Sequence, residues 1–161
     1  MSAGKKLLVP IDGSANSLRA LAFVIKRVKK DKQLRICLLN VQPPLPRSLF
    51  VTRTMIAEFH DSKSKEALAR SREILAKNHM CAEIIVRIGK VAEAIVKFAM
   101  QRHCGEIIMG TRGLGSLKGL LLGSITTKLI HLARAPVTSF REGPVALRTI
   151  PDDSAKQWRP L

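Results

Sequence analysis

Short apolar segments alternate with amphipathic segments along most of the chain, and this alternation limits the fold more than any other feature. Five apolar segments are predicted to be strands, at residues 7–11, 34–41, 82–88, 106–109 and 136–140. Between them, apolar residues recur at helical spacing. Strands that alternate with helices form a parallel sheet joined by crossover helices. The sequence therefore predicts an α/β domain over residues 1–140, followed by a polar, proline-containing tail at 141–161.

The first and second predicted helices have clear boundaries. The turn Asp12-Gly13-Ser14 precedes the first helix, and the Ser14 hydroxyl is expected to cap it. Proline lacks the N–H group that a strand needs, so the run from Gln42 to Pro46 is predicted to be a loop. The second helix is expected from about Thr54 to Asn78. Its buried side is predicted to contain Met55, Phe59, Ala67, Leu68, Ser71, Ile74 and Leu75.

Length and composition exclude several classes of protein. A chain of 161 residues that is 46% hydrophobic can bury one substantial core. No apolar stretch approaches the roughly 20 residues that a membrane span needs, and the first residues lack the apolar run of a secretory signal. We therefore expect a cytoplasmic protein without membrane insertion. Cys37, Cys81 and Cys104 are expected to be reduced, buried thiols, since they form no CxxC motif and their number is odd.

The chain carries a formal net charge of +16 and has a pI near 10.7. Such an excess attracts polyanions of every kind, including nucleotides, nucleic acids and anionic membranes. The densest basic run, at residues 26–32, coincides with the predicted end of the first helix, where cations complement the helix dipole. No aromatic residue is interleaved there to stack on bases, which favours a solvated helix end over a nucleic-acid patch.

The segment that follows the fourth strand has the pattern GxxGx9GS, formed by Gly110, Gly113, Gly123 and Ser124. Glycines can leave backbone N–H groups free to bind a phosphate chain. The segment joins the carboxyl end of a strand to the amino end of a helix, which is where anions bind in open α/β sheets. Amides near Gly113, Gly123 and Ser124 are therefore expected to face phosphates, and the Ser124 hydroxyl is expected to cap the fourth helix.

The loop after the first strand offers a carboxylate for the other end of a nucleotide. Asp12 can accept hydrogen bonds from an adenine amino group or from ribose hydroxyls. Considered by itself, Asp12 would be interpreted as a turn residue. The combination of this loop with the glycine-rich segment favours a nucleotide site between the two loops.

Two segments, KKLLVPIDGSANSLRAL at residues 5–21 and GEIIMGTRGLGSLKGLLLGSITTKLIHLARAPV at 105–137, resemble the universal stress protein family, whose members share GxxGx9G followed by Ser or Thr. A looser match covers residues 88–95, so the resemblance extends from Lys5 to about Phe140. It implies a Rossmann-like, doubly wound open sheet of five parallel strands in the order 3-2-1-4-5, with helices on both faces. It also implies a homodimer joined through edge strand five.

The family contains members that bind ATP and members that do not, and Gly110, Gly113, Gly123 and Ser124 match the ATP-binding pattern. The resemblance further implies that adenosine is bound by Pro10, Asp12, Val41 and Met109, the last two through backbone groups and apolar contact. Thr111, Arg112, Ser116 and Ile125 are weaker candidates near the phosphates, with Arg112 expected to be a solvent-facing charge. Any Mg²⁺ or Mn²⁺ would be carried by the phosphates.

Some positions depart from the family pattern. Asn40 stands where histidine is frequent, Lys90-Val91 where Asp-Pro is common, and the run Val137 to Phe140 is more polar than usual, which bears on the edge-to-edge dimer. The main alternative to ATP binding is a nucleotide-free stress protein that acts through protein or nucleic-acid contacts of its basic surface.

Catalysis is expected to be slow at most. The P-loop pattern GxxxxGK[ST] is absent from the sequence, so no catalytic residue is assigned, and only slow ATP hydrolysis or autophosphorylation stays open. Two short pairs, His79 with Cys81 and His103 with Cys104, suggest a zinc site. The inferred strand order separates these pairs by two strands, so no metal site is assigned.

Overall fold

Five parallel strands form the centre of the molecule in the order β3-β2-β1-β4-β5, as the sequence predicts. The computed structural model describes residues 5–46, 51–111 and 123–140. The strands are β1 (Lys6–Pro10), β2 (Arg35–Gln42), β3 (Ala82–Ile88), β4 (Cys104–Gly110) and β5 (Val137–Phe140). The helices are α1 (Ala15–Lys30), α2 (Arg53–Lys77), α3 (Val91–Gln101) and α4 (Ser124–Leu132).

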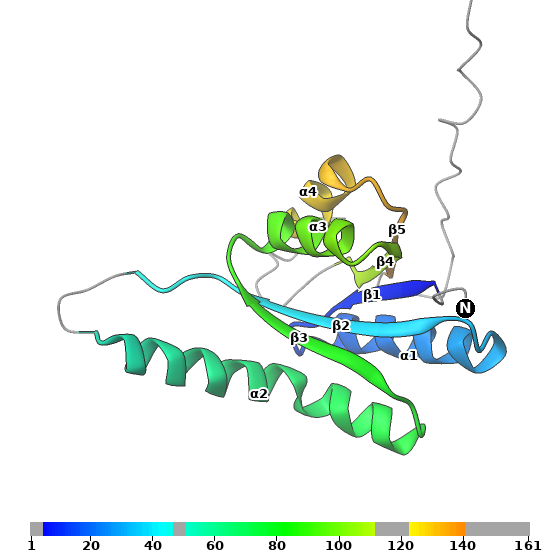
Figure 1. Ribbon diagram of the computed structural model, residues 1–161, viewed down its shortest axis with the longest axis horizontal. Coiled ribbons are helices and arrows are strands. Elements are labelled where there is room, and N and C mark those ends of the chain that lie inside the picture. Colours follow the sequence, from blue (N-terminus) through cyan, green and yellow to red (C-terminus); the bar gives the residue numbers. More distant parts are fainter. Residues whose placement is uncertain (1–4, 47–50, 112–122, 141–161) are drawn as a thin grey trace, which may run out of the picture.

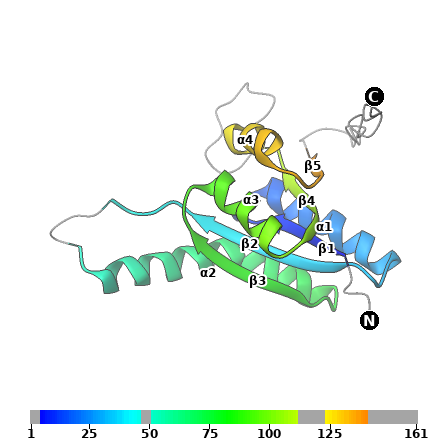
Figure 2. The same cartoon turned by 45° about the horizontal axis from the view of Figure 1, so that its top comes forward.

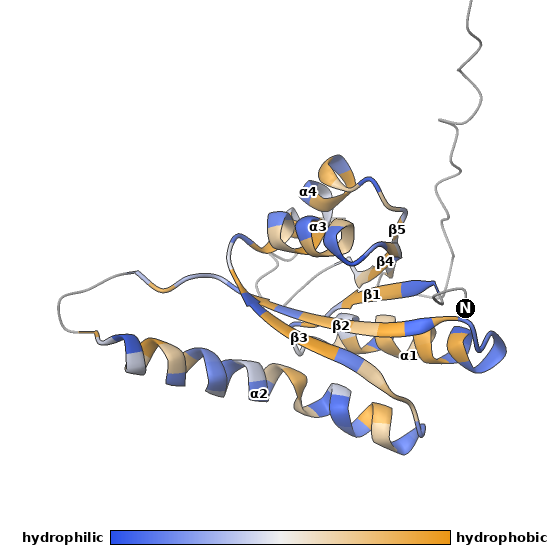
Figure 3. Cartoon of the chain, viewed as in Figure 1, coloured by the Kyte–Doolittle hydropathy of each residue, from blue (hydrophilic) through white to orange (hydrophobic). Residues whose placement is uncertain are grey.

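Helices cover both faces of the sheet, with α1 and α2 on one side and α3 and α4 on the other (Figures 1 and 2). Because successive side chains of a strand point to opposite faces, each strand contributes to two cores. In β1, Leu7 and Val9 pack with α1 and α2, while Leu8 packs with α3 and α4. The apolar residues along the strands stand out in Figure 3. Both cores extend to the carboxyl ends of β1 and β4, where the candidate site lies.

The boundary of the first helix is confirmed, and that of the second strand needs a correction. Ser14 is the N-cap of α1, and its Oγ accepts a hydrogen bond from the backbone N–H of Ser17 at 3.2 Å. Gln42 was expected in the proline-rich loop, but it is the last residue of β2. Gln42 has the N–H group that Pro43 lacks, so the strand extends up to the first proline.

The prediction for the buried side of α2 is wrong in the first two turns of the helix. Met55 and Phe59 are 52% and 43% exposed, and burial begins at His60. The helix has 25 residues, roughly 37 Å, whereas the 8 residues of β2 span roughly 26 Å. The amino end of α2 therefore extends past the sheet, as Figure 1 shows. Further along, Leu68, Ser71 and Leu75 are buried as predicted.

The cysteine prediction holds for two of three residues. Cys37 and Cys104 are buried free thiols, whereas Cys81 is exposed because it lies just before the edge strand β3. Across residues 5–46, 51–111 and 123–140, no helix combines the length and the apolar character needed to cross a membrane. The predicted tail at 141–161 lies outside the described residues.

Candidate functional site

The carboxyl ends of β1 and β4 form the point where the sheet changes its winding direction. β1 pairs with β2 on one side and with β4 on the other. The chain leaves β1 through α1 on one face of the sheet, and it leaves β4 towards α4 on the opposite face. The two connections therefore diverge at the strand ends, which is the position where open α/β sheets bind ligands.

The connections after β1 and β4 lie in direct contact. A Cβ atom added to Gly110, the last residue of β4, would lie 2.5 Å from Cβ and 2.8 Å from the carbonyl carbon of Asn16. Both distances are shorter than real Cβ contacts, so only glycine allows the end of β4 to approach the first turn of α1 this closely. Gly110 therefore brings the two predicted loops together.

Asp12 lies in a tight turn between β1 and α1. Its Oδ1 atom accepts a hydrogen bond from the backbone N–H of Ser14 at 2.9 Å, which fixes the direction of the carboxylate. Gly13 has a φ of +84°, a left-handed conformation that glycine adopts without strain. The α carbon of Gly13 packs closely on α2, since an added Cβ would lie 3.2 Å from Cα of Ala67. The half-buried Asp12 is therefore held in a rigid turn.

Three of the predicted adenosine-binding residues share one face of the sheet. Val41 and Met109 belong to the core against α3 and α4, and Pro10 lies on the same face because Leu8, two residues earlier, does. They lie on the neighbouring strands β2, β1 and β4 near their carboxyl ends. Met109 is buried, at 7% exposure.

The start of the glycine-rich segment is anchored to β5 and α4. The Thr111 N–H donates to the Phe140 carbonyl at 2.7 Å, and the Gly123 N–H donates to the Thr111 carbonyl at 2.7 Å. The Thr126 hydroxyl reaches the carbonyls of Gly110 and Thr111 at 3.3 and 3.2 Å. Since the Gly123 amide is engaged by Thr111, the amides of the described residues beside it that can face an anion are those of the first turn of α4.

One feature of that helix differs from the prediction. Gly123, rather than Ser124, is the N-cap of α4, and as a glycine it has no side chain with which to cap the helix. Ser124 is the first helical residue and is exposed, while Ile125 is 38% exposed. The N–H groups of this first turn have no acceptor within the helix, which leaves a partial positive charge there. Arg112, Gly113 and Ser116 lie outside the described residues.

A buried polar network beside the site was not predicted. Asn40 Nδ2 donates to the Ile11 carbonyl at 2.7 Å. Gln42 Nε2 donates to Asn40 Oδ1 and to the His60 carbonyl, both at 3.0 Å. Gln42 Oε1 lies 2.8 Å from His60 Nδ1 and must be the acceptor, so His60 carries its proton on Nδ1. The network links α2 to the residue before Asp12.

The signal for this network was present in the sequence. Asn40 and Gln42 alternate with apolar neighbours in a strand that is otherwise buried, which indicates a polar pair on one face. Their partner on α2 could not be identified without the tertiary structure. His60 Nε2 has no hydrogen-bond partner among the residues that the structure describes, and His60 is 5% exposed.

The histidines and cysteines give no metal centre in the described parts of the chain, where no three His, Cys, Asp or Glu residues come together. Burial raises the pKa of Cys37 from 9.0 to about 12, and it also raises the pKa of Cys104. Both thiols therefore stay protonated near neutral pH, which makes them poor metal ligands and nucleophiles.

Comparison with known proteins identifies the family. The sequence model of the universal stress protein family matches residues 4–141. Universal stress protein YxiE of Bacillus subtilis is 30% identical over 146 residues, which covers 84% of this chain and 98% of YxiE. The solved structure of MJ0577, a universal stress protein of Methanocaldococcus jannaschii, has a TM-score of 0.72 at 28% identity and covers 89% of this chain and 99% of its own.

Two further solved structures contain nucleotides. A universal stress protein in complex with cAMP has a TM-score of 0.64 at 20% identity and covers 86% of this chain and 98% of its own. An Arabidopsis thaliana family member with AMP bound has a TM-score of 0.60 at 15% identity, and it covers 86% of this chain and 92% of its own. These two show a shared fold. With the family match over residues 4–141 and the strand order 3-2-1-4-5, the chain belongs to the universal stress protein family.

Proposed function

We propose that this universal stress protein binds ATP in the crevice above the carboxyl ends of β1 and β4 and acts in the cytoplasm as a nucleotide-dependent stress regulator or sensor. The adenosine would lie against Pro10, Val41 and Met109, with Asp12 accepting hydrogen bonds from the ribose or the adenine amino group. The phosphates would lie at the glycine-rich segment and the amino end of α4.

The contact between Gly110 and Asn16 carries this proposal. It joins the end of β4 to the first turn of α1, so the Asp12 loop and the segment that leads to α4 start beside one another, as a nucleotide bound by both would require. One side chain beside the site, Thr111, also has hydrogen-bonding capacity to spare. Thr111 is 5% exposed, and its hydroxyl has no hydrogen-bond partner within the described part of the chain. A phosphate oxygen at the loop would supply the acceptor that this hydroxyl lacks.

The nucleotides bound to the two structural relatives support the adenosine half of the proposal. AMP and cAMP share adenosine with one phosphate. The preference for a triphosphate rests on the GxxGx9GS pattern and on the net charge of +16, which favours the more highly charged ligand. Mg²⁺ or Mn²⁺ would be held mainly by the phosphate oxygens. Binding, rather than turnover, would be the core activity.

Thermal unfolding with ATP and with AMP tests the proposal. A ligand at 100 times its Kd stabilises the folded state by about 2.7 kcal/mol, which corresponds to a Tm increase of roughly 5–11 °C for a domain of this size. Asp12→Ala should abolish most of this increase. Asp31→Ala is a matched control, because Asp31 Oδ1 accepts a 2.9 Å bond from the N–H two residues later, as Asp12 does.

The outcomes separate the alternatives. An unchanged Tm with either nucleotide, together with steeply salt-dependent binding of DNA or RNA, would instead support a nucleotide-free protein that uses its basic surface. Equal losses in Asp12→Ala and Asp31→Ala would show that the Asp12 carboxylate does not contact the ligand. Phosphate release that disappears in Asp12→Ala would add slow hydrolysis to binding.

We also propose a homodimer that forms through β5. This strand lies at the edge of the sheet, and its partner in the described chain is β4 alone. The unpaired edge presents backbone groups that a second copy can bind. Sedimentation velocity should detect a dimer, and Ser139→Pro, which removes one backbone donor from the edge strand, should shift the equilibrium towards monomer. A monomeric parent protein would contradict this proposal.

A further inference from the structure

The edge strand β5 is linked to α1 by a carboxylate that lies outside the candidate site. The side chain of Glu106, near the start of β4, is 12% exposed, and its Oε2 atom lies 2.7 Å from Nη1 of Arg27 in the last turn of α1. Its Oε1 atom accepts a hydrogen bond from the Thr138 hydroxyl of β5 at 2.6 Å. Thr138 belongs to the run that is more polar than the family pattern. Both oxygens of one carboxylate are therefore engaged, one by the helix and the other by the edge strand.

An aromatic pair makes a second link between the same two elements. The rings of Phe23 on α1 and Phe140 on β5 have their centroids 4.6 Å apart. The guanidinium carbon of Arg27 lies 5.7 Å from the centroid of the Phe23 ring, so the cation that binds Glu106 also contacts the aromatic pair. Thr138 and Phe140 are two residues apart in the strand and point to the same face of the sheet. The carboxylate and the aromatic pair thus hold the same face of β5.

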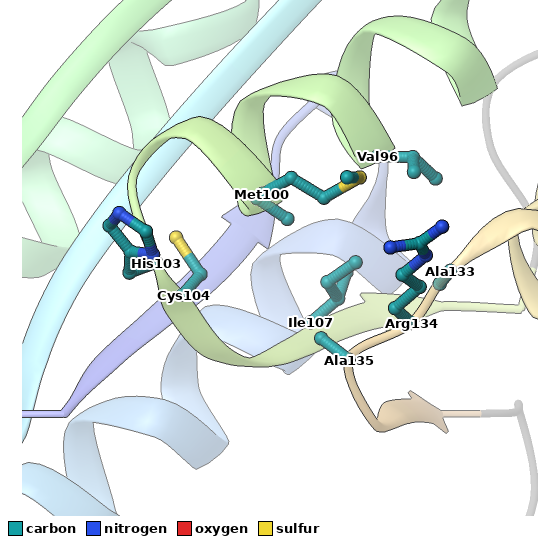
Figure 4. A pocket seen from close by; sticks show the side chains of 9 residues that line it. Val96, Met100, His103, Cys104, Ile107, Ala133, Arg134 and Ala135 are labelled. Atoms are coloured by element: carbon teal, nitrogen blue, oxygen red, sulfur yellow. The ribbon is translucent and has the colours of Figure 1, made fainter.

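The strand β5 has little other support in the described chain. It has four residues, none of which is buried, and it pairs there with β4 alone. On the face towards α3, Val137 packs against the core, but the connection from α4 to β5 borders a pocket of about 260 Å³. Ala133, Arg134 and Ala135 of this connection line the pocket together with residues of α3 and β4 (Figure 4). The contacts with α1 are therefore important for where β5 lies.

The position of β5 is transmitted to the candidate site by backbone hydrogen bonds. The Phe140 carbonyl accepts the 2.7 Å hydrogen bond from the Thr111 N–H, and the Thr111 carbonyl accepts one of the same length from the Gly123 N–H. Gly123 is the N-cap of α4, and the Thr126 hydroxyl of the same helix donates to the Thr111 carbonyl at 3.2 Å. A displacement of β5 should therefore displace Thr111 and the amino end of α4 with it.

We propose that Glu106 is a positioning residue for phosphate binding: by linking Thr138 to α1, it holds β5, and through β5 it holds Thr111 and the amino end of α4 where the phosphates bind. This inference rests on the proposed function, which places the phosphates at that helix end. Glu106 itself would not touch the nucleotide, because it lies four residues before Gly110, roughly 13 Å along β4 from the strand end.

The two ends of the nucleotide should respond differently to the loss of this contact. Asp12 is held in its own turn by the hydrogen bond from the Ser14 N–H, and Val41 belongs to β2, so neither depends on β5. The amino end of α4 depends on β5 through Thr111. Loss of the Glu106 contact should therefore weaken the binding of ATP and leave the binding of adenosine unchanged. A merely structural role would weaken the binding of both ligands by the same factor.

Isothermal titration calorimetry with Mg·ATP and with adenosine tests the proposal. Thr138→Val keeps a β-branched residue in the strand but removes the hydroxyl. We expect the Kd of ATP to rise roughly fivefold or more, as for typical couplings between separate sites, and the Kd of adenosine to stay the same. Thr138→Ser, which keeps a hydroxyl, should bind ATP as the parent protein does. The control Glu83→Gln breaks an ion pair with Arg102 at the other edge strand, β3, and should change neither Kd.

Amide hydrogen exchange of the ligand-free protein tests the same contact without nucleotide. Because the Thr111 N–H donates to β5, its exchange should be faster in Thr138→Val than in the parent protein or in Glu83→Gln. Circular dichroism first establishes that the variants are folded. If Thr138→Val is not, Arg27→Gln serves instead, because it frees the other oxygen of Glu106.

The proposal is overturned if Thr138→Val binds ATP as tightly as the parent protein, or if it loses ATP and adenosine by the same factor. Failure of Thr138→Ser to restore ATP binding, or unchanged exchange of the Thr111 amide in Thr138→Val, overturns it as well. In each of these cases the parent protein still binds ATP. A parent protein that binds neither ligand would instead refute the proposed function, and the role of Glu106 in binding with it.

Discussion

The substitution Gly110→Ala is the sharpest test of the contact that forms the candidate site. The new methyl group would lie 2.5 Å from Cβ and 2.8 Å from the backbone carbonyl carbon of Asn16. A backbone atom in the first turn of α1 cannot move without moving the helix, so the strain cannot be relieved by a rotamer change. Gly110 does not have a left-handed φ, so alanine adopts the conformation and the effect is purely steric.

The size of the effect follows from two opposing contributions. Overpacking at a buried position destabilises the folded state by about 1–3 kcal/mol. Because the new methyl group meets backbone atoms that cannot move aside, we expect a cost of about 2–3 kcal/mol here. Alanine also lowers the conformational entropy of the unfolded chain, which adds about 0.4–1 kcal/mol to the free energy of unfolding. The net loss should be about 1–2.5 kcal/mol, or a Tm decrease of roughly 2–10 °C for a domain of this size.

Two other glycines provide matched controls for differential scanning calorimetry. At Gly89 an added Cβ would have its nearest contact with Ala94 at 3.8 Å, an ordinary distance, so Gly89→Ala should be neutral or slightly stabilising. At Gly105 the added atom would meet the Lys5 side chain at 2.4 Å, but that chain is flexible and can move. If Gly110→Ala unfolds at the same temperature as Gly89→Ala, the close approach of the two loops is refuted.

Four further outcomes are expected. His79 has a φ of +53°, so His79→Gly should remove about 1–2 kcal/mol of backbone strain, while the freer unfolded chain takes back about 0.4–1 kcal/mol; the urea midpoint should rise by the difference, and a midpoint lowered by the full unfolded-chain cost would argue against strain there. Asn40→Leu should destabilise by about 1–3 kcal/mol, since it leaves the Ile11 carbonyl buried without a donor; a neutral result in urea unfolding would show that the network adds nothing. The pKa of Cys37 is raised to about 12 in the folded protein, so the unfolded chain alone ionises this thiol above pH 9.0, and stability should fall as pH rises from 9.0 towards 12. This fall should be shallower in Cys37→Ala, and parallel pH profiles would contradict the assignment. The exposed Cys81 should react with a thiol reagent at neutral pH well before Cys37 does, as mass spectrometry of the labelled protein can establish.

Much of the fold was predictable because its signals are local. The alternation of strand and helix patterns indicates a parallel sheet, and the cap at Ser14 follows from residues a few positions apart. The strand order rested on the family resemblance, since local patterns do not determine which strands become neighbours. The exposure of Met55 and Phe59 was not predictable, because it depends on how far α2 extends past the sheet.

For the site, the sequence by itself determined the two loops and the residue types that suit a nucleotide, because glycine and aspartate have conformational and hydrogen-bonding properties that do not depend on distant neighbours. Tertiary structure alone decided that Gly110 packs on Asn16, that the Gly123 amide is engaged by Thr111, and that Asn40, Gln42 and His60 form one network. Each of these joins residues from different elements. The distances between such residues are set by the packing of whole helices on the sheet.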